Sequence, residues 1–305
     1  MVHLDRHFIA IGTATLDRVY QMQDLPHEGG KYRAHAYLEV GGGIAANAAV
    51  AIARLGERVE FIGRVGSDAA GRHIVAGLAA ERVGTRGVQI IRGTRSVTPA
   101  VLVDASGERI TVSNTDPRLY DGAGGIDAML EEVERSAGVM ADVRWIAGAK
   151  IVLQAARRAG RPVVLDVEKA PRAAVDELAP LASHLLFSRP GLEFYSGQAD
   201  PGRGLLAVRE VLDGVVGVTL GGDGALIATG TGVVHIPAPA VKVVDTTGAG
   251  DAFHGAYVVA VADGADAIEA ARFASAVAAL KCTRLGGRAG LPTRDEVEDF
   301  RRLHG

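Results

Sequence analysis

The residues best suited to chemistry lie near the C-terminal end of the chain. Asp251 follows the small residues Gly248-Ala249-Gly250 and precedes an apolar run that is compatible with a helix. Successive backbone N–H groups at a helix N-terminus, together with the helix dipole, form a binding site for an anion. A carboxylate beside that anion could accept a proton from an attacking hydroxyl while the amides stabilise phosphoryl oxygens. Acidic residues are common at helix starts, but the whole stretch from 244 to 256 favours phosphoryl transfer with Asp251 as the base.

Glycine is grouped in the sequence. The chain contains 40 glycines, and they do not form a low-complexity tract. Glycine lets the backbone approach a ligand closely and adopt positive φ. A turn would explain any one group, but four groups together indicate a protein that binds phosphate through main-chain amides. The groups are Gly41–Gly43, Gly221–Gly224, Gly248–Gly250 and Gly286–Gly290.

Composition and charge are those of an ordinary globular protein. The 305 residues are 48% hydrophobic and 23% charged. A formal net charge of −3, without a run of Lys or Arg, argues against a nucleic-acid partner. The longest apolar stretches, such as Gly255–Ala262, are too short to cross a bilayer, and the N-terminus lacks a signal-peptide layout, so we expect no membrane partner and a cytoplasmic location. The one cysteine, Cys282, excludes an intrachain disulfide.

The elements that must position these residues are predicted from hydrophobic periodicity. After Asp121, short apolar strands alternate with helical stretches, which predicts βαβ units and a mostly parallel sheet. The alternating segments at 13–40 and 96–114 read as half-exposed strands that could pair into a small sheet, either a lid over a site or a dimer surface. The strands expected elsewhere are 7–11, 59–62, 139–143, 163–166, 185–187 and 215–220, with hairpins pairing 96–103 with 108–113 and 226–228 with 233–236. Helices are expected at 47–55, 70–81, 250–281 and from 294.

Two signatures resemble those of the ribokinase-like (PfkB) carbohydrate kinases. One contains Gly248-Ala249-Gly250-Asp251, and the other is Gly42-Gly43-Ile44-Ala45-Ala46-Asn47. The resemblance covers nearly the whole chain, including Phe61–Asp68 and Thr219–Gly224. It implies an ATP-dependent sugar kinase with a single α/β domain over residues 1–305, whose mostly parallel central sheet is flanked by helices. It also implies a small β-sheet lid, built from 13–40 and 96–114, that often pairs between subunits as a homodimer.

The resemblance further implies roles for individual residues. Asp251 would be the base, and Gly248, Ala249 and Gly250 would form the anion hole. The sugar hydroxyls would meet Asp17, Gly42, Gly43 and Asn47. The nucleotide phosphates would meet Thr219, Gly221 and Gly224. Lys281 and Arg284 are expected near the adenine end, as solvated helix charges or nucleotide contacts, and the first interpretation is preferred for Lys281.

Metal ions are implied as well. Mg²⁺ accompanies ATP, and the family's Asn-x-x-Glu element, which helps to organise it, is expected near Ser188–Glu193. Glu193 can supply the acid, but Pro190 stands where Asn is expected. Asp166, at a strand end, is therefore a second candidate for the water shell of Mg²⁺. Asp245 and Thr247 resemble residues that flank a monovalent-cation site in some members, so K⁺ is a further candidate.

Three residues suggest an anionic sugar. Lys31 lies in the exposed β-region, Asn114 ends a hairpin strand and Arg144 follows the strand 139–143. Ligands gather at strand ends in such folds, so these residues could meet at one end of the sugar. Charge-assisted hydrogen bonds from two cations would suit an anionic substituent there. A lone Lys is, however, more often a solvated surface charge. Stretches such as Asp17–Tyr20 and Ala141–Trp145 resemble the sulfofructose-phosphorylating members of the family, which implies transfer to the 1-hydroxyl of 6-deoxy-6-sulfofructose with these three residues on the sulfonate. Fructose 6-phosphate, tagatose 6-phosphate and 2-keto-3-deoxygluconate are anionic alternatives.

Two interpretations come from other classes of protein. The run Gly41–Ala46 fits the dinucleotide fingerprint G-x-G-x-x-A of an oxidoreductase. However, the segment 34–40 before it alternates, whereas the first strand of that fold is buried on both faces. A non-catalytic sugar-binding regulator on the same fold is the more serious alternative, and the intact Gly248–Asp251 argues against it.

Overall fold

The computed structural model describes residues 6–105, 108–230 and 232–304. Its larger part is a nine-stranded sheet in the order β13-β12-β11-β10-β9-β8-β1-β4-β5. All pairings from β11 through β5 are parallel, and β12 and β13 add an antiparallel edge. The strands are β1 (His7–Gly12), β4 (Arg58–Gly66), β5 (Gly84–Ile91), β8 (Gly138–Asp142), β9 (Val163–Val167), β10 (His184–Ser188), β11 (Val215–Thr219), β12 (Ala225–Thr229) and β13 (Gly232–Ile236).

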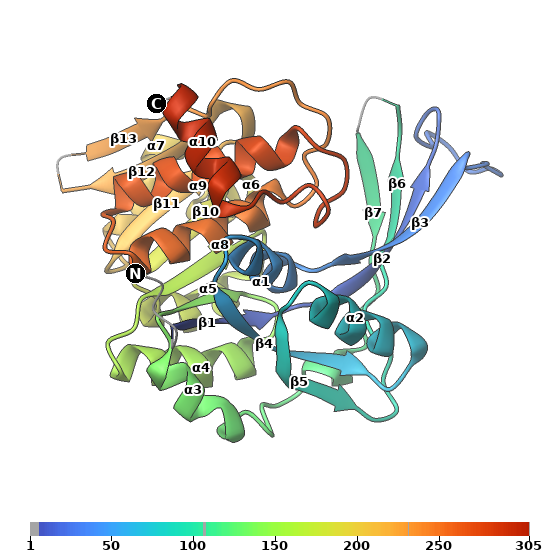
Figure 1. The fold of residues 1–305 in the computed structure, drawn as a ribbon, viewed down its shortest axis with the longest axis horizontal. Helices are drawn as coiled ribbons and strands as arrows, with labels where there is room; N and C mark the ends of the chain where they lie inside the picture. The colour runs from blue at the N-terminus through green and yellow to red at the C-terminus, as the bar shows by residue number, and fades with distance from the viewer. Residues whose placement is uncertain (1–5, 106–107, 231, 305) are drawn as a thin grey trace.

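Helices cover both faces of this sheet, which gives three layers (Figure 1). In β1 every residue is buried, with Phe8 and Ala10 in one apolar cluster and Ile9 and Ile11 in the other. A strand buried on both faces carries a continuous apolar run, which is why this one was recognisable in the sequence. The first cluster is completed by α1 (Ile44–Arg54), α2 (Ala69–Ala80), α8 (Ala249–Ala262), α9 (Ala267–Cys282) and α10 (Arg294–His304). The second is completed by α3 (Leu130–Arg135), α4 (Ile146–Arg158), α5 (Arg172–Leu178), α6 (Arg189–Ser196) and α7 (Pro201–Arg209).

A second sheet of four strands stands away from the helical layers (Figure 1). Its order is β3-β2-β6-β7, in which the outer pairings are antiparallel and β2 runs parallel to β6. Most of its residues are partly or fully exposed, in keeping with the alternating pattern in the sequence. The strands are β2 (Thr15–Gln21), β3 (Ala36–Gly42), β6 (Ala100–Val103) and β7 (Arg109–Val112).

The structure departs from the expected elements at three places. The helix expected over 250–281 is two helices, because Gly264 has a φ of 91° and Asp266 caps a new helix by accepting from the amides of Ile268 and Glu269. The strand expected over 96–103 begins only at Ala100. The strand β5 was not foreseen, since its residues are mostly half-buried at the sheet edge.

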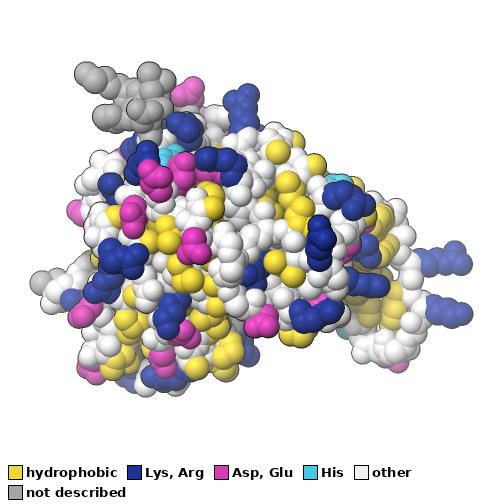
Figure 2. Space-filling view, turned by 90° about the horizontal axis from the view of Figure 1, so that it is seen from below, with side chains coloured by type: hydrophobic (Ala, Val, Ile, Leu, Met, Phe, Trp, Pro, Cys, Tyr) yellow, Lys and Arg dark blue, Asp and Glu magenta, His cyan; other side chains and the backbone are white. Residues whose placement is uncertain are grey.

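The distribution of charged side chains on the surface agrees with the small net charge of the sequence. On the face seen in Figure 2, basic side chains are interspersed with acidic ones rather than gathered into one basic patch. Among the described residues, no helix is both long enough and apolar enough to cross a membrane.

Candidate active site

Two predicted site residues, Asp166 and Thr219, lie along one edge of the large sheet, where its parallel strands end. Asp142 at the end of β8 is in register with Asp166 on β9. Ser188 at the end of β10 is in register with Thr219 at the end of β11. Ligands of open α/β sheets bind outside this carboxyl edge, so the register gathers residues that are far apart in the sequence at one ligand-binding edge.

Asp251 lies in the first turn of α8, after a tight turn at Gly248. Gly248 has a φ of 74°, which favours glycine, and the amide of Ala249 donates to the carbonyl oxygen of Thr246 over 3.2 Å. The amides of Gly250 and Asp251 follow in the first helical turn, where a helix offers no internal acceptor. Apart from the neighbouring residues and the backbone of α8 itself, no described atom lies within 4 Å of the place that a Cβ on Gly250 would take. The amides of Gly250 and Asp251 are therefore available to an anion, whereas the amide of Ala249, one of the three predicted, is already used in the turn.

Asn47 and Arg288 hold the carboxylate of Asp251. The side-chain amide of Asn47, on α1, donates to Asp251 Oδ2 over 2.7 Å. Arg288 donates from Nε to Asn47 Oδ1 over 2.8 Å and from Nη2 to the carbonyl oxygen of Gly42 over 2.9 Å. A Cβ on Gly41 would lie 2.2 Å from Arg288 Nη1, so a side chain at this position would displace the guanidinium. A glycine-rich strand end and a buried arginine thus orient the amide of Asn47 toward Asp251.

Asp17 joins this cluster from β2. Its Oδ1 accepts a hydrogen bond from the Thr15 hydroxyl over 2.5 Å. A Cβ on Gly42 would lie 2.4 Å from Asp17 Oδ2, so the carboxylate packs directly on the backbone of Gly42. Gly43, with a φ of 94°, then starts α1. Burial raises the pKa of Asp17, and the Thr15 hydroxyl acts in the opposite direction.

The surroundings of Asp251 shift its proton affinity. Burial raises the pKa of Asp251 to about 7. The hydrogen bond from Asn47 and the charge of His254 lower it, while the carboxylates of Asp166 and Glu168 raise it further. A carboxyl group with a pKa near neutrality is suited to accept a proton at physiological pH.

A group of buried charged residues adjoins Asp251. His254 Nδ1 lies 2.8 Å from Asp166 Oδ2, and both side chains are 2% exposed. The Ser188 hydroxyl donates to Glu168 Oε2 over 3.0 Å, and burial together with Asp166 raises the pKa of Glu168. Asp166 Oδ1 and His254 Nε2 are buried without a hydrogen-bond partner among the described residues. Because unpaired buried polar atoms are costly, these atoms mark a place where a water or ion would be held.

A glycine-rich turn follows β11. Gly221 and Gly224 have φ values of 61° and 90°. A Cβ on Gly224 would lie 2.0 Å from the carbonyl oxygen of Ile236, whereas the described residues leave open space in front of Gly221. The Thr219 hydroxyl donates to the carbonyl oxygen of Phe187 over 3.4 Å. The turn therefore offers exposed backbone that a phosphate can approach closely.

Asp245 and Lys281 tie the turn before α8 to the end of α9. Asp245 accepts from the amide of Thr247 through Oδ1 and from the amide of Gly286 through Oδ2, both over 2.8 Å. The ammonium group of Lys281 donates to the carbonyl oxygen of Asp245 over 2.6 Å and lies 3.6 Å from its Oδ2. Lys281 is fully buried, so the expectation of a solvated helix charge was wrong. A hydrogen bond from the amide of Val244 to the carbonyl oxygen of Cys282 also joins these two segments.

Comparison with known proteins decides the family. The family model described as pfkB family carbohydrate kinase matches residues 5–294. The chain belongs to the pfkB family of carbohydrate kinases. It is 30% identical to the ribokinase of Bacillus subtilis over 297 residues, which are 97% of this chain and 99% of that protein. It is 31% identical to the aminoimidazole riboside kinase of Salmonella typhimurium, over 96% of this chain and 94% of that enzyme.

Solved structures agree with this assignment. A structure of an Agrobacterium tumefaciens protein is 34% identical and superimposes with a TM-score of 0.92 over 98% of each chain. A structure of the ribokinase of Arabidopsis thaliana, complexed with ribose and ATP, is 26% identical with a TM-score of 0.83, over 97% of this chain and 98% of that one. The predicted ribokinase-like fold and the predicted carbohydrate kinase class are confirmed.

The residues expected on an anionic substituent of the sugar come from three elements. Lys31 lies between β2 and β3, Asn114 follows β7 and Arg144 follows β8, and all three are exposed. The amide of Arg144 donates to Asp142 Oδ1 over 2.9 Å. Burial raises the pKa of Glu168, and the charge of Arg144 lowers it. The guanidinium of Arg144 therefore lies near Glu168, at the carboxyl edge of the sheet. Within the described residues no hydrogen bond or ion pair joins Lys31 or Asn114 to Arg144, so their common site stays a prediction.

In this pfkB kinase, the start of α6 is a regular helix start. Ser188 caps the helix by accepting from the amide of Gly191 over 3.2 Å, and Pro190 occupies the first turn, where proline fits. Glu193 is exposed on this helix. The carboxylate near Asp251 is instead Glu168, which follows Asp166 by two residues and was not singled out from the sequence.

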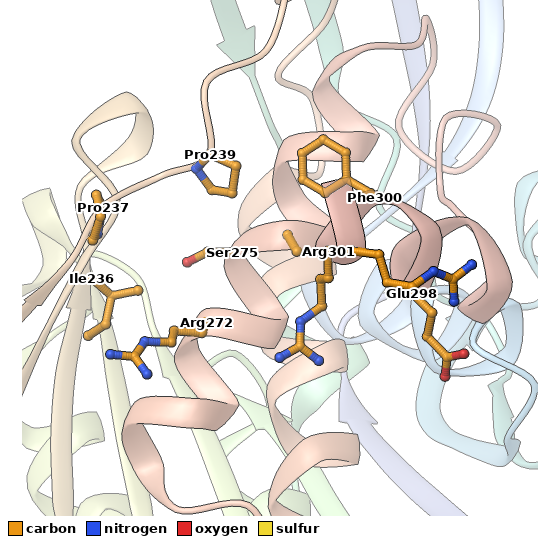
Figure 3. A pocket seen from close by; sticks show the side chains of 10 residues that line it. Ile236, Pro237, Pro239, Arg272, Ser275, Glu298, Phe300 and Arg301 are labelled. Carbon is orange, nitrogen blue, oxygen red and sulfur yellow. The ribbon is translucent and has the colours of Figure 1, made fainter. Parts of the chain in front are cut away.

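A separate pocket lies between the end of β13 and the helices α9 and α10 (Figure 3). Its arginines are partly neutralised, since Arg272 and Arg301 both lie near Glu269. None of the predicted site residues lines it. The lining residues are Ile236, Pro237, Pro239, Arg272, Ser275, Ala276, Glu298, Phe300, Arg301 and Arg302.

Proposed function

We propose that this kinase transfers the γ-phosphoryl group of ATP to a sugar hydroxyl, with Asp251 as the general base. The observation that carries the proposal is the position of Asp251 in the first turn of α8, beside backbone amides and 2.7 Å from Asn47 Nδ2. The sugar oxygen forms a bond to the γ-phosphorus, the bond from that phosphorus to ADP breaks, and Asp251 takes the proton of the hydroxyl. Its pKa of about 7 suits this task.

The two substrates approach Asp251 from different elements. Asp17, Asn47 and the backbone at Gly42 and Gly43 bind the sugar hydroxyls. The nucleotide phosphates run along the turn after β11, at Thr219, Gly221 and Gly224, toward the start of α8. There the amides of Gly250 and Asp251 form the anion hole, since the amide of Ala249 donates to Thr246. Support comes from the cluster that joins Asp17, Gly42, Asn47 and Asp251, and from a related plant ribokinase whose structure contains ribose and ATP.

Mg²⁺ neutralises charge on the phosphates in such transfers. The residues here fit it, because Asp166 Oδ1 is buried without a partner among the described residues and Glu168 lies close enough to feel its charge. Mg²⁺ commonly keeps several waters and takes only one or two carboxylates. This agrees with the finding that no group of three or more His, Cys, Asp or Glu in the described ranges is arranged to hold a metal ion. We therefore assign Mg²⁺ to Asp166 and Glu168, and no longer to the exposed Glu193.

The sugar is proposed to be 6-deoxy-6-sulfofructose, phosphorylated at its 1-hydroxyl. A sulfonate needs donors that carry positive charge, and Arg144 at the carboxyl edge supplies one. Lys31 and Asn114 lie on exposed segments of the small sheet and its connections, which could bring them to the far end of a bound sugar. Ribose is a second candidate, since ribokinases from several organisms are similar to the chain over nearly its whole length.

A substrate panel tests this choice. Initial rates of ADP formation would be measured with sulfofructose, fructose 6-phosphate, tagatose 6-phosphate, 2-keto-3-deoxygluconate, fructose and ribose. We expect the highest kcat/KM for sulfofructose, and in Arg144→Ala a raised KM for the anionic sugars alone. A preference for ribose, or an equal effect of the variant on neutral sugars, would exclude the sulfonate site while leaving Asp251 in place. Sugar binding without any turnover would favour the regulator instead.

The small sheet is proposed to pair two copies of the chain. It carries several exposed apolar side chains, of which Val112 is 65% exposed and Tyr37 49% exposed. Apolar groups on a free sheet surface favour association. Sedimentation equilibrium would distinguish a dimer from a monomer.

A further inference from the structure

The turn that delivers the anion-binding amides is held by an ammonium group from the chain itself. Both carboxylate oxygens of Asp245 accept amide bonds, one from Thr247 just before the anion hole and one from Gly286. The ammonium of Lys281 donates to the carbonyl oxygen of Asp245 over 2.6 Å and lies 3.6 Å from Oδ2. Asp245 and Lys281 together therefore join the loop before α8 to the loop after α9.

This geometry does not fit a free monovalent cation beside Asp245 and Thr247. A cation site in such a turn needs a single positive charge surrounded by carbonyl and carboxylate oxygens. Lys281 Nζ already supplies that charge, contacts oxygens of both kinds, and belongs to a side chain that is 0% exposed. An ammonium ion and K⁺ carry the same charge, so their presence side by side in one buried turn would be strongly unfavourable.

We infer that Lys281 takes the place of a monovalent cation, so that this kinase needs no K⁺. This inference rests on the proposed function, because the turn that Lys281 holds is the one that presents the amides of Gly250 and Asp251 to the phosphoryl group. The same contact has a second consequence. Asp245 also fixes Gly286, at the start of the loop whose Arg288 orients Asn47. Loss of the ammonium is therefore expected to disturb the anion hole and the hydrogen bond to Asp251 together.

The test compares cation dependence in the wild-type enzyme and in two variants. Activity and thermal unfolding would be measured at constant ionic strength in tetramethylammonium, Na⁺, K⁺ and ammonium chlorides. The wild-type enzyme should show the same kcat and Tm in all four salts. Lys281→Ala leaves room for an ion, so it should have a lower Tm and roughly tenfold lower kcat in tetramethylammonium chloride, in line with the loss of a charged hydrogen bond, and K⁺ or ammonium should partly restore both. Lys281→Met fills the space with an apolar chain and should not respond.

Lys150, which is half-buried and pairs with Glu177, provides the matched control, and Lys150→Ala should behave as the wild-type enzyme does. Activation of the wild-type enzyme by K⁺, or a rise of its Tm in K⁺, would overturn the inference, and this comparison decides even if the variants fail to fold. A Lys281→Ala enzyme with normal kcat and Tm without cations would also overturn it, as would a slow one that no cation restores. The unfolding measurement needs no turnover, so it stands apart from any failure of the proposed substrate or reaction.

Discussion

The side-chain amide of Asn47 donates a hydrogen bond to Asp251 Oδ2 over 2.7 Å, although the two residues are 204 positions apart. The bond joins the first turn of α1 to the first turn of α8. A hydrogen bond to an ionised carboxylate favours the ionised form, so Asn47 lowers a pKa that burial raises. The proton affinity of Asp251 is therefore set by two opposing effects that different residues supply.

The first prediction concerns pH dependence. Because Asp251 must be ionised to accept a proton, kcat/KM of the wild-type enzyme should rise with pH through about 7. In Asn47→Ala the stabilising bond to the carboxylate is lost, so the midpoint should move about one pH unit higher. Rates from pH 5.5 to 9 for both enzymes would check this. A lower rate with an unchanged midpoint would mean that Asn47 acts only by binding the sugar.

A second prediction concerns stability. The pKa of Asp251 is raised from 3.8 to about 7, so the folded protein holds this proton more tightly than the unfolded chain does. The free energy of unfolding therefore falls as the pH rises from 3.8 to about 7. At pH 8 the folded protein carries the full energetic cost of the buried charge. Asp251→Asn should therefore raise the free energy of unfolding at pH 8 by about a few kcal/mol, and by progressively less toward pH 4. Denaturant unfolding at both pH values, with the exposed Asp213→Asn as control, measures this, and a variant less stable than the wild type at pH 8 would contradict it.

The third prediction concerns Arg288. It makes two hydrogen bonds from different nitrogens, to Asn47 Oδ1 and to the carbonyl oxygen of Gly42. Lysine keeps the charge but cannot reproduce this fork. Arg288→Lys should lower kcat/KM by about 10- to 100-fold while the fold is retained, as judged by circular dichroism. Wild-type kinetics in this variant would show that Asn47 keeps its orientation without the arginine.

The fourth prediction separates two candidates for Mg²⁺. Glu168 lies among the charged residues near Asp251, whereas Glu193 is exposed on α6. Glu168→Gln should weaken Mn²⁺ binding in the presence of a non-hydrolysable ATP analogue by about tenfold, whereas Glu193→Gln should not change it. Electron paramagnetic resonance of bound Mn²⁺ reports this without turnover. The opposite ranking of the two variants would return the metal to α6.

The sequence was most informative where geometry permits only one type of residue. Gly248 needs positive φ, and a Cβ on Gly41 or Gly42 would displace the side-chain ends of Arg288 and Asp17. The glycines themselves lie in short groups along the chain, so this pattern can be read without the fold.

Long-range partners left a weaker signal. Arg288 lies inside the predicted group Gly286–Gly290, but its bond to Asn47 spans 241 positions and no spacing reveals it. Lys281 looked like a solvated charge because the last turn of a helix is usually exposed, and only the docking of the turn at Asp245 buries it. Glu168 could have been noted as the second acid of an Asp-x-Glu pair at a strand end.

The central claim is that Asp251 removes the proton of the attacking hydroxyl. Its most direct test is a single-turnover, rapid-quench measurement of phosphoryl transfer in Asp251→Asn, with the dissociation constants of ATP and sugar determined separately. The variant should bind both substrates within a few-fold of the wild-type enzyme and transfer the phosphoryl group about 10³-fold more slowly, within the range of general-base effects. A transfer rate within tenfold of the wild-type value would show that another group accepts the proton.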